Sequence, residues 1–477
     1  MSHQPSGTRR LSCPFLCIGH SVNHLRQKFS QSVGLPIRDA LPADAIEAVV
    51  RSEGLTYRRC LFDPVVTIWA FLSQILDSDR SCRKALSRVW AYLGESSDQA
   101  LPFDADAVAD TGAYCKARQR LSEAVLNRLY RQVAQPLEAD LPPERLWRGR
   151  HVYLVDGTTL LLPDTPENQA AYPQHPNQKE GCGFPLTKLV AIFSLLTGAV
   201  KEATNDVWSA YEPALLRRIR ACLTPGDVLV GDRIYCTYAD IALLKQQQVD
   251  PIFRLHQARK VDFRKGKRLA KHDHIFVWEK PKQCPQGLPL EHYKQWPATL
   301  EIRVLRFSVH PKGFRAKQVT VATTLLDPMA YPKEEIAALY GLRWEVEIDL
   351  RHLKSSMDMD LLRTKSPAMI RKEMALYFLA YNLIRSLMAQ AATRHGKDPA
   401  RLSFKGTLQH LNTFLPLLAM SGAKKRKQHY DTLLLLVARE RLPDRPLRKE
   451  PRVVKRRPKS SRWMQEPRPV LKQKRAA

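Results

Sequence analysis

The sequence predicts an α/β protein with a mixed sheet, preceded by an all-helical domain, interrupted by a β insertion and followed by a basic tail. Three observations along the chain support this fold class. Apolar residues recur at helical spacing over 37–148, and short β-rich runs alternate with helical stretches over 149–255. Alternating apolar and polar segments then occupy 256–325. With 477 residues, of which 44% are hydrophobic, the chain is long enough for two or three domains.

The helical domain is expected at 37–148. The segments "DPVVTIWAFLSQIL" and "YCKARQRLSEAVLNRLYRQV" carry apolar residues at helical spacing. Ser122 precedes the second apolar run, and Pro136 is expected to close it. Basic residues recur on these helices, as in a DNA-reading module, although a solvated helix face gives the same pattern. These residues are Arg83, Lys84, Arg88, Lys116, Arg118, Arg120, Arg128 and Arg131.

The mixed sheet is expected to begin at "HVYLVDGTTLLLP". β-rich runs occur at 151–155 and 159–162, and "KLVAIFSLL" leads through the turn Thr197-Gly198 into a returning strand. The helical stretch 209–222, the apolar run "DVLVGD", the helical "YADIALLKQQQ" and the strand "PIFRL" follow. The order of three strands, helix, strand, helix and strand predicts a mixed sheet with helices packed on its faces.

The rest of the chain divides by composition. An N-terminal extension is expected at 1–36, and the segments "HIFVWE", "LEIRVLRFSV" and "AKQVTVATTLL" predict antiparallel strands within 256–325. Helical spacing resumes within 326–420. The remaining 421–477 contains one last apolar helix and a tail, with nineteen Lys and Arg against five acids from Lys424 onward. The segment "EPRVVKRRPKSSRW" cannot bury a core, so it is expected to stay loose until it meets phosphate.

The net charge points to a polyanionic partner. A formal charge of +29 and a pI near 9.9 favour nucleic acid, with an anionic membrane surface as the weaker alternative. Because no stretch approaches the roughly 20 unbroken apolar residues of a spanning helix, no membrane segment is expected. The amino terminus does not read as a signal peptide, since Pro14 interrupts its apolar patch and no small-residue cleavage site follows.

The nine cysteines are scattered along the chain without a CxxC pair. An odd number with no regular spacing does not predict a disulfide framework. They are expected in a reducing cytoplasm, mostly as small buried hydrophobes.

Two aspartates follow apolar runs. "HVYLVD" places Asp156 at the carboxyl end of a predicted strand before Gly157, and "DVLVGD" places Asp232 after Gly231. Since the carboxyl ends of strands open onto the ligand crevice in such sheets, two such aspartates would converge. Asp-Gly and Gly-Asp are also ordinary turn dipeptides, so a capping role is the alternative for each.

The stretch "YGLRWEVEIDLRHLK" places one carboxylate among several cations. At about 100° per residue, Glu347 shares one stripe of a helix with Tyr340, Arg343, Arg351 and Lys354. Glu345 and Asp349 fall on the opposite side, while Leu342, Val346 and Leu353 would form a buried seam. An amphipathic surface helix is the ordinary explanation, but an i,i+4 ion-pair ladder would carry more equal numbers of acids. The cations therefore suit phosphates, and Glu347 suits a metal ion.

Three acids from three elements are enough for a phosphodiester-cleaving metal site. In-line displacement uses two divalent ions about 3.5–4 Å apart, one at the attacking oxygen and one at the leaving oxygen. Hard ions such as Mg²⁺ prefer carboxylate oxygens and keep several waters. Asp156, Asp232 and Glu347 are the candidate ligands.

The spacing Tyr340-x2-Arg343-x3-Glu347-x6-Lys354 resembles the YREK signature of the insertion-sequence-four (IS-four) family of DDE transposases. The resemblance covers most of the chain and includes "YCKARQRLS", "VDGTTLLLPDTPENQAAYPQ", "PGDVLVGDRIYCTYADI" and "RTKSPAMIRKEMALYFLAYNLIR". It implies a ribonuclease-H-like core in two parts, 149–255 and 326–420, with the β insertion between them. The 115 residues from Asp232 to Glu347 agree with this arrangement.

The resemblance also implies roles for individual residues. Asp156, Asp232 and Glu347 would bind Mg²⁺, for which Mn²⁺ can substitute, and would carry catalysis. Phosphates of the transposon end would be contacted by Tyr340, Arg343 and Lys354, with Arg351 and Arg233 beside them. A tryptophan of the insertion would stack on a flipped base, and the candidates are Trp278 and Trp296, with strand packing as the alternative for each.

The function implied by this resemblance is cut-and-paste DNA transposition. The expected partners are the terminal inverted repeats and target DNA, with a homodimer in the DNA complex, no membrane, and a cytoplasmic, nucleoid-associated location. Two alternatives stay open: a noncatalytic DNA-binding protein derived from such an enzyme, and a ribonuclease-H-type nuclease acting on RNA or hybrids. Metal-dependent strand cutting would distinguish a transposase from the noncatalytic DNA-binding protein, and a preference for DNA over RNA would distinguish it from the nuclease.

Overall fold

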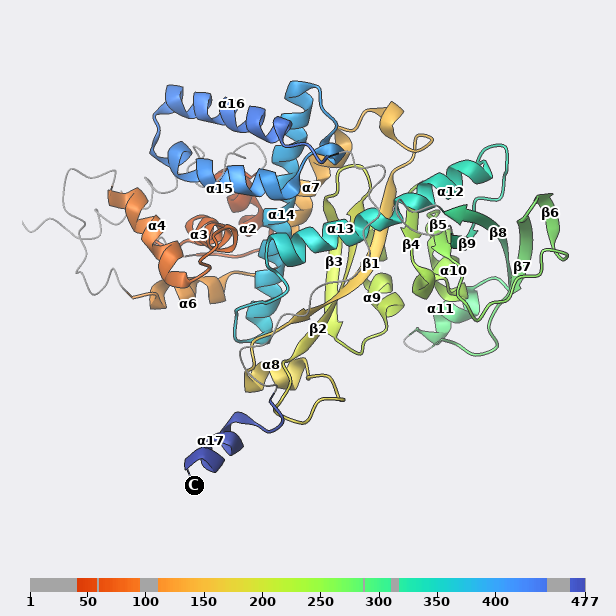
Figure 1. Cartoon of the computed structure of the whole chain (residues 1–477), viewed down its shortest axis with the longest axis horizontal. Helices are drawn as coiled ribbons and strands as arrows, with labels where there is room; N and C mark the ends of the chain where they lie inside the picture. Colours follow the sequence, from red (N-terminus) through yellow and green to blue (C-terminus); the bar gives the residue numbers. More distant parts are fainter. Residues whose placement is uncertain are drawn as a thin grey trace, which may run out of the picture. The chain divides into compact units, whose positions relative to one another are not determined.

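A computed structural model describes residues 41–57, 60–94, 110–285, 288–309, 317–443 and 464–476 (Figure 1). The predicted extension at 1–36 and the tail at 450–463 lie outside these residues. The chain divides into two compact units. The first comprises the residues up to Val133, Ala375–Lys397 and Leu402–Glu440, and the second comprises Ala134–Met374, Asp398–Arg401 and the residues from Arg441.

The first unit is helical, as predicted. It contains α2 (Ala43–Ser52), α3 (Pro64–Leu76), α4 (Cys82–Gly94), α6 (Gly112–Arg120), α15 (Phe404–Met420), α16 (Ala423–Arg439) and parts of α7 (Glu123–Ala139) and α14 (Pro367–His395). Helix α3 is buried along almost its whole length, so it forms the centre of this core. It begins where the Asp63 carboxylate accepts a hydrogen bond of 2.9 Å from Val66 N and Pro64 fixes the first helical φ.

Pro136 does not close its helix, contrary to the prediction. Helix α7 begins directly after Ser122 and continues through Pro136 to Ala139. Proline removes one backbone donor but does not end a helix whose buried face is still packed. That face includes Val125, Leu129 and Val133.

The second unit is built on one sheet of nine strands, in the order β3-β2-β1-β4-β5-β9-β8-β7-β6. The strands are β1 (Val152–Leu161), β2 (Leu186–Ser194), β3 (Val200–Val207), β4 (Val228–Gly231), β5 (Asp250–Arg254), β6 (Lys267–Ala270), β7 (Asp273–Glu279), β8 (Thr299–Val309) and β9 (Lys317–Thr323). Strands β1, β2 and β3 pair antiparallel, and β4 and β5 follow parallel to β1. This is the predicted mixed sheet.

The predicted insertion extends the same sheet. Strand β9 pairs antiparallel with β5, and β8, β7 and β6 follow as antiparallel neighbours. The short elements that were not predicted include α8 (Pro166–Ala171), α11 (Leu290–Gln295) and β6. Each is only four to six residues long, which is too short for a periodic pattern to show.

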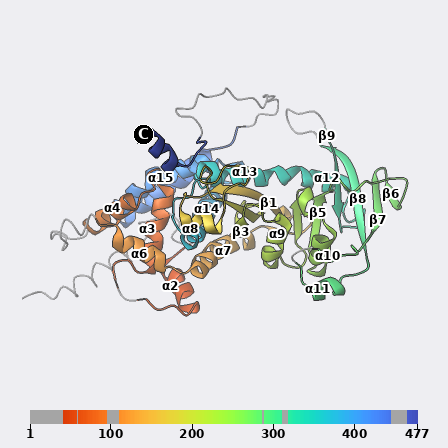
Figure 2. The same ribbon diagram turned by 90° about the horizontal axis from the view of Figure 1, so that it is seen from below.

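Helices cover the sheet on both sides. Helices α9 (Glu212–Ile219) and α10 (Tyr238–Gln246) pack with inward-facing residues of β1, β2 and β4 in one apolar core. Helices α12 (Lys333–Gly341) and α13 (Glu345–Arg351) run along the other side of the strands (Figure 2). Side chains alternate along a strand, so consecutive residues face these two sides in turn.

Candidate active site

Strand register places Asp156 and Asp232 side by side. The parallel pairing of β1 with β4 ends at Val155 opposite Gly231, and the two aspartates are the next residues. Val155 belongs to the core beneath α9 and α10, and Gly231 abuts it there. Strand alternation therefore turns both aspartates to the opposite face of the sheet.

Asp156 is not at the end of its strand, contrary to the prediction. Strand β1 continues to Leu161, paired with β2 and bridged at Leu161 to Leu361, whereas β4 ends at Gly231 and the 3₁₀ turn Arg233–Tyr235 follows. The aspartate marks the end of the parallel pairing instead. The point at which the parallel pairing ends, where such a sheet is expected to bind its ligand, therefore lies beside the middle of β1.

Glu347 comes from a separate element, α13, which packs beside β1. Its carboxylate accepts a hydrogen bond of 3.0 Å from Arg343 Nη2, and its side chain is 39% exposed. The Arg343 side chain is only 9% exposed and lies 4.5 Å from the centre of the Trp344 ring. Arg343 therefore sits as a buried cation among the acids, in electrostatic contact with both Glu347 and Asp232.

The pKa of Asp156 reflects the same grouping. Burial raises it to about 6. The hydrogen bond that Gly157 N donates over 2.9 Å and the charge of Arg343 oppose this rise, while the negative charges of Glu212 and Glu347 add to it. Asp156 and Glu347 are therefore close enough to repel, as carboxylates sharing one cation would be.

The carboxylates of Asp156, Asp232 and Glu347 suit a hard divalent ion, although they do not form a complete metal site in this structure. Asp232 Oδ1 is buried and accepts no hydrogen bond from the described residues, which leaves an oxygen free for a cation. Among the described residues, no three acidic, histidine or cysteine side chains form a ready metal cluster. Glu347 would have to exchange Arg343 for the ion.

Tyr340 and Lys354, from the same signature, are both held in place, the first by burial and the second by hydrogen bonds. Tyr340 is buried, and burial raises its pKa to about 12, an increase that Arg343 opposes. Lys354 Nζ donates to Thr158 Oγ1 and to the carbonyl oxygen of Thr159, both over 3.0 Å. Its ammonium thus joins the helical segment to β1 two residues beyond Asp156.

Arg351 and Arg233 are exposed, as a phosphate contact requires. Arg351 is the last residue of α13. Arg233 follows Asp232 directly and donates a 2.8 Å hydrogen bond from Nη1 to Gln257 Oε1. Both cations therefore flank the acids from separate elements.

The structure does not support a base-stacking role for Trp278 or Trp296. Their exposed fractions are 5% and 3%, and both rings belong to the apolar core. Arg259 covers the Trp278 ring at 3.8 Å, and Trp296 packs against Tyr238 and Tyr293. Trp278 lies on β7 and Trp296 directly follows α11, and both contribute to this core.

The predicted helical stripe is only partly correct. Val346 and Leu353 are buried as expected, but Leu342 is 45% exposed. A 3₁₀ turn at Leu342–Trp344 and a π-helical segment at His352–Ser356 flank α13, so one 100° period does not hold from Tyr340 to Lys354. Asp349, placed on the side away from Glu347, is buried.

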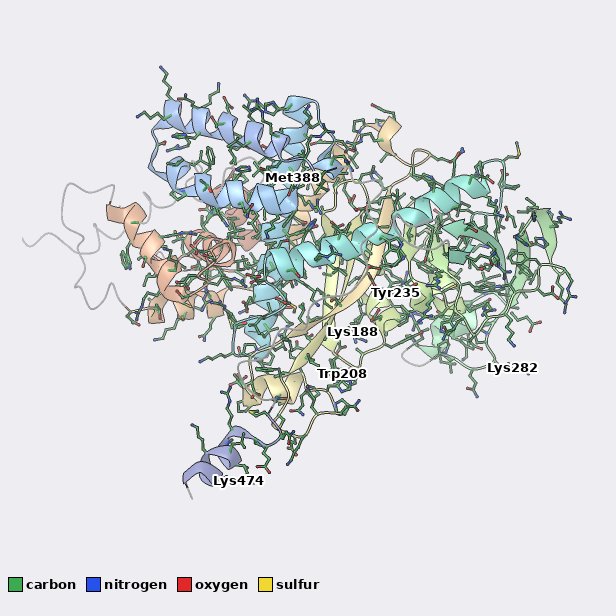
Figure 3. All side chains as sticks on the ribbon, viewed as in Figure 1. Lys188, Trp208, Tyr235, Lys282, Met388 and Lys474 are labelled. Carbon is green, nitrogen blue, oxygen red and sulfur yellow. The ribbon has the colours of Figure 1, made fainter. Side chains whose placement is uncertain are left out.

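A fourth carboxylate, Glu212, was missed. It is the first residue of α9, and its carboxyl carbon lies so close to Gly157 that a Cβ there would approach it to 2.7 Å. Lys188 Nζ lies 3.7 Å from Glu212 Oε1, and the Tyr235 hydroxyl donates to Oε2 over 3.3 Å; both partners are labelled in Figure 3. Nothing in the spacing of Glu212 from Asp156 indicates this approach, which depends on how α9 packs.

No helix among the described residues is both long and apolar enough to cross a membrane.

Comparison with known proteins gives the family. The family model for the transposase DDE domain matches residues 147–383, a range that includes all three acids. Transposase InsG for insertion sequence element IS4 of Escherichia coli (strain K12) is 27% identical over 431 residues, which cover 88% of this chain and 91% of that protein. Putative transposase InsZ of the same organism is 26% identical over 137 residues, which cover 28% of this chain and 45% of that protein.

A solved structure, the cryo-EM structure of the piggyBac transposase synaptic complex with hairpin DNA, aligns with 90% of this chain and 86% of its own. Its TM-score is 0.40 and its sequence identity is 10%. The family follows from the domain match and from the similarity to InsG along nearly the whole chain. The chain belongs to the IS-four family of DDE transposases.

Proposed function

We propose that this transposase binds the terminal inverted repeats of an insertion sequence and moves the element by cut-and-paste transposition. Metal-dependent cleavage of the DNA strand at the element's end would be followed by transfer of the freed 3′-hydroxyl to target DNA. The observation that carries this proposal is the placement of Asp156 and Asp232 as neighbours on one face of the sheet, with Glu347 on the helix packed beside it.

Asp156, Asp232 and Glu347 would hold Mg²⁺, with Mn²⁺ as a substitute. When bound, such ions activate the attacking oxygen and stabilise the leaving oxygen of the displacement. Asp232 Oδ1, which accepts no hydrogen bond from the described residues, and the negative charges of Glu212 and Glu347 near the buried Asp156 both favour uptake of a divalent cation at this place.

In the absence of DNA and metal, Arg343 would occupy the position that a metal ion takes later. It pairs with Glu347 and interacts electrostatically with Asp232, which limits repulsion among the carboxylates. Once Glu347 turns to a metal ion, the guanidinium is free to donate to a phosphate of the transposon end. Arg351 and Arg233 would contact neighbouring phosphates, and Tyr340 and Lys354 would fix the helix against the sheet at the scissile bond.

The helical region would recognise the inverted repeats, and the basic tail would add affinity that does not depend on sequence. Arg118, counted among the candidate DNA-facing cations of that region, is buried at 8% exposure, so it is removed from the proposed contact surface. The net charge of +29 supports a strongly salt-dependent interaction with DNA. Because two transposon ends must be joined in concert, we expect a homodimer in the DNA complex.

End-labelled DNA carrying the element's terminus tests the proposal. Purified protein with Mg²⁺ should nick at the terminus, and the Glu347→Ala variant should not. Glu345→Ala is the matched control, because Glu345 is an exposed acid on the same helix outside the proposed trio.

Full cleavage by Glu347→Ala would refute the assignment of the three acids. Binding without any divalent-dependent cutting by the wild type would favour the noncatalytic alternative. Preferential cutting of RNA or hybrids would favour the ribonuclease.

A further inference from the structure

Two cysteines of the helical unit lie in contact although 33 positions separate them. Cys82 is the first residue of α4, and Cys115 lies within α6. The Cys115 thiol donates to Cys82 Sγ over 3.8 Å. Both side chains are partly exposed, so a small reagent can reach them.

A buried guanidinium holds the two sulfur atoms together. Arg118 Nη2 donates to Cys82 Sγ over 3.1 Å and to Cys115 Sγ over 3.5 Å. The guanidinium carbon lies 4.9 Å from the ring centres of both Phe71 and Tyr114, so it cannot swing away without losing both contacts.

Gln74 of α3 completes this arrangement. Its Oε1 accepts from the Tyr114 hydroxyl over 2.8 Å and from Arg118 Nη1 over 3.3 Å. Its Nε2 donates to the carbonyl oxygen of Arg80 over 2.7 Å and approaches Cys82 Sγ at 3.8 Å. Three helices therefore determine where the sulfur atoms lie.

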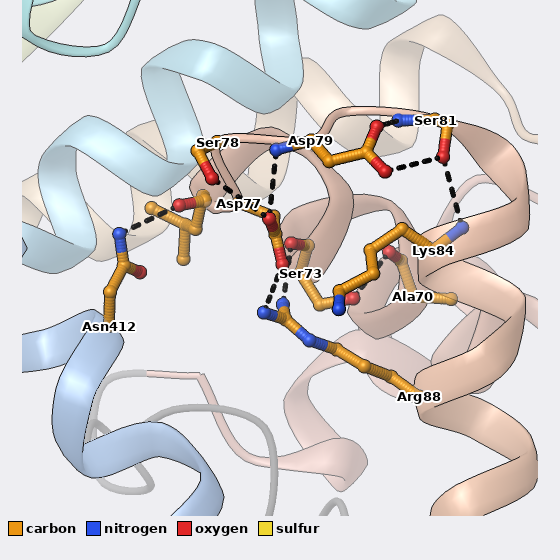
Figure 4. A network of polar contacts seen from close by, with 10 residues as sticks. Ala70, Ser73, Asp77, Ser78, Asp79, Ser81, Lys84, Arg88 and Asn412 are labelled. Atoms are coloured by element: carbon orange, nitrogen blue, oxygen red, sulfur yellow. Dashed lines mark hydrogen bonds and ion pairs between the residues drawn. The ribbon is translucent and has the colours of Figure 1, made fainter.

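The turn ahead of Cys82 is also fixed (Figure 4). Asp79 accepts from Ser81 N over 3.1 Å, and Ser81 Oγ accepts from Lys84 N over 3.1 Å. Arg88 of α4 pairs with Asp77 at the end of α3. The amino end of α4 is thus held at both its turn and its side, so Cys82 keeps its position.

We propose that Cys82 and Cys115 form an oxidation-sensitive dithiol that a hydroperoxide converts into an intramolecular disulfide. The sulfur atoms must approach from 3.8 Å to about 2.05 Å, a change of less than about 2 Å that side-chain rotation can supply. The bond would join α4 to α6 covalently. This inference does not depend on the proposed function.

The chemistry balances with one peroxide per disulfide. With hydrogen peroxide, a thiolate attacks one oxygen, the O–O bond breaks and a sulfenic acid forms, and the departing hydroxide takes up the proton that the thiol had released and leaves as water. The second thiol attacks the sulfenic sulfur, forms the S–S bond and releases a second water. The two cysteines lose two electrons, which the peroxide gains.

Arg118 and the amino end of α4 both favour the thiolate that starts this reaction. Burial raises the pKa of Cys82 and Arg118 opposes that rise. Arg118 offsets part of the loss of solvent around this sulfur, while the pKa of Cys82 stays above its usual value.

Peptide mapping of the full-length protein tests the proposal. The reduced protein is treated with hydrogen peroxide, quenched with N-ethylmaleimide and digested. We expect a Cys82–Cys115 linked peptide, two hydrogens lighter than its parts and released by dithiothreitol. Cys182→Ser, a matched control on a partly exposed cysteine of the other unit, should leave the link intact.

Cys82→Ser and Cys115→Ser should each abolish the link. Recovery of both cysteines as maleimide adducts, under conditions that oxidise other cysteines, would overturn the proposal. Separate sulfinic acids at the two positions would also overturn it. The wild-type map decides the matter even if a serine variant fails to fold, and no step of it depends on DNA cleavage.

Discussion

The strand-borne acids and the helix-borne acid are held in opposite ways. The positions of Asp156 and Asp232 follow directly from a parallel register, and Gly231 beside Asp232 is packed against core side chains. Glu347 stands on a seven-residue helix between a 3₁₀ turn and a π-helical segment, half-exposed and paired with an arginine of its own segment. The sheet therefore fixes two ligands, whereas the helix carries a third that can change partner.

This difference explains how a DNA-cutting site can be built without being permanently assembled. Three carboxylates held together without a cation would repel one another, and the charges of Glu212 and Glu347 already add to the rise that burial causes in the pKa of Asp156. A movable third ligand with its own counter-charge reduces that cost.

The largest effect is expected on the strand side of the site. Asp232→Asn should lower metal-dependent cleavage at least about 100-fold, because even outer partners of metal ligands typically contribute about 10–100-fold. Asp206→Asn, in the same sheet but paired with Arg218 at 2.7 Å, is the control and should retain activity. Equal cleavage rates for the two variants would remove Asp232 from the site.

Alanine substitutions at Gly231 in the sheet and at Gly341 before the helix should differ in their effect on the free energy of unfolding. An alanine Cβ at Gly231 would approach Val155 Cγ1 to 2.9 Å and Phe253 to 3.1 Å, so Gly231→Ala should lower the free energy of unfolding by about 1–3 kcal/mol. Gly341→Ala on the helix side meets nothing within 4 Å at a helical φ, and should be neutral or stabilising by up to about 1 kcal/mol. Urea denaturation followed by circular dichroism measures both. An equal loss of unfolding free energy in the two variants would contradict the expected difference between the sheet and the helix.

Asp156 should destabilise the metal-free fold at neutral pH. Its folded pKa of about 6 lies above the unfolded value near 3.9, so the folded state binds more protons between these values and stability falls as pH rises through them. Asp156→Asn should therefore stabilise the metal-free protein by about 2 kcal/mol at pH 7 and by much less at pH 4. Urea denaturation of both proteins at the two pH values measures the difference in their free energies of unfolding. A difference that does not change with pH would argue against the raised pKa.

Glu347→Gln should change stability least. Its ion pair with Arg343 is an i,i+4 pair on a half-exposed side chain, and such pairs contribute about 0.3–0.5 kcal/mol. The variant should nevertheless lose cleavage as severely as Asp232→Asn. A stability loss of several kcal/mol would mean that the pair is structural and does not release its glutamate.

Much of the fold could be predicted from periodicity. The strands from β1 to β5, with α9 and α10 between them, and the long helices follow the predicted order, because long helices repeat their pattern and short buried strands stand out as apolar runs between turn residues. Pro136 was misjudged because tertiary packing outweighs the loss of one hydrogen bond. The continuation of the sheet from β5 into β9 depends on pairing between distant segments, which local patterns do not encode.

The site was predictable where it depends on register. Asp156 and Asp232 follow apolar strands that pair in parallel, so their proximity could be inferred from two short runs. Glu212 and the burial of Trp278 and Trp296 depend on how α9 and the insertion pack, and no sequence spacing reports that. The role of Arg343 as the immediate partner of Glu347 emerges only from the side-chain geometry.

The most direct measurement of the central claim is anomalous diffraction from Mn²⁺ in crystals of the protein bound to transposon-end DNA. The account predicts manganese peaks within about 2.2 Å of oxygens from Asp156, Asp232 and Glu347, with Arg343 moved from Glu347 to a phosphate. Peaks elsewhere, or a manganese ion bound while Glu347 still pairs with Arg343, would contradict it.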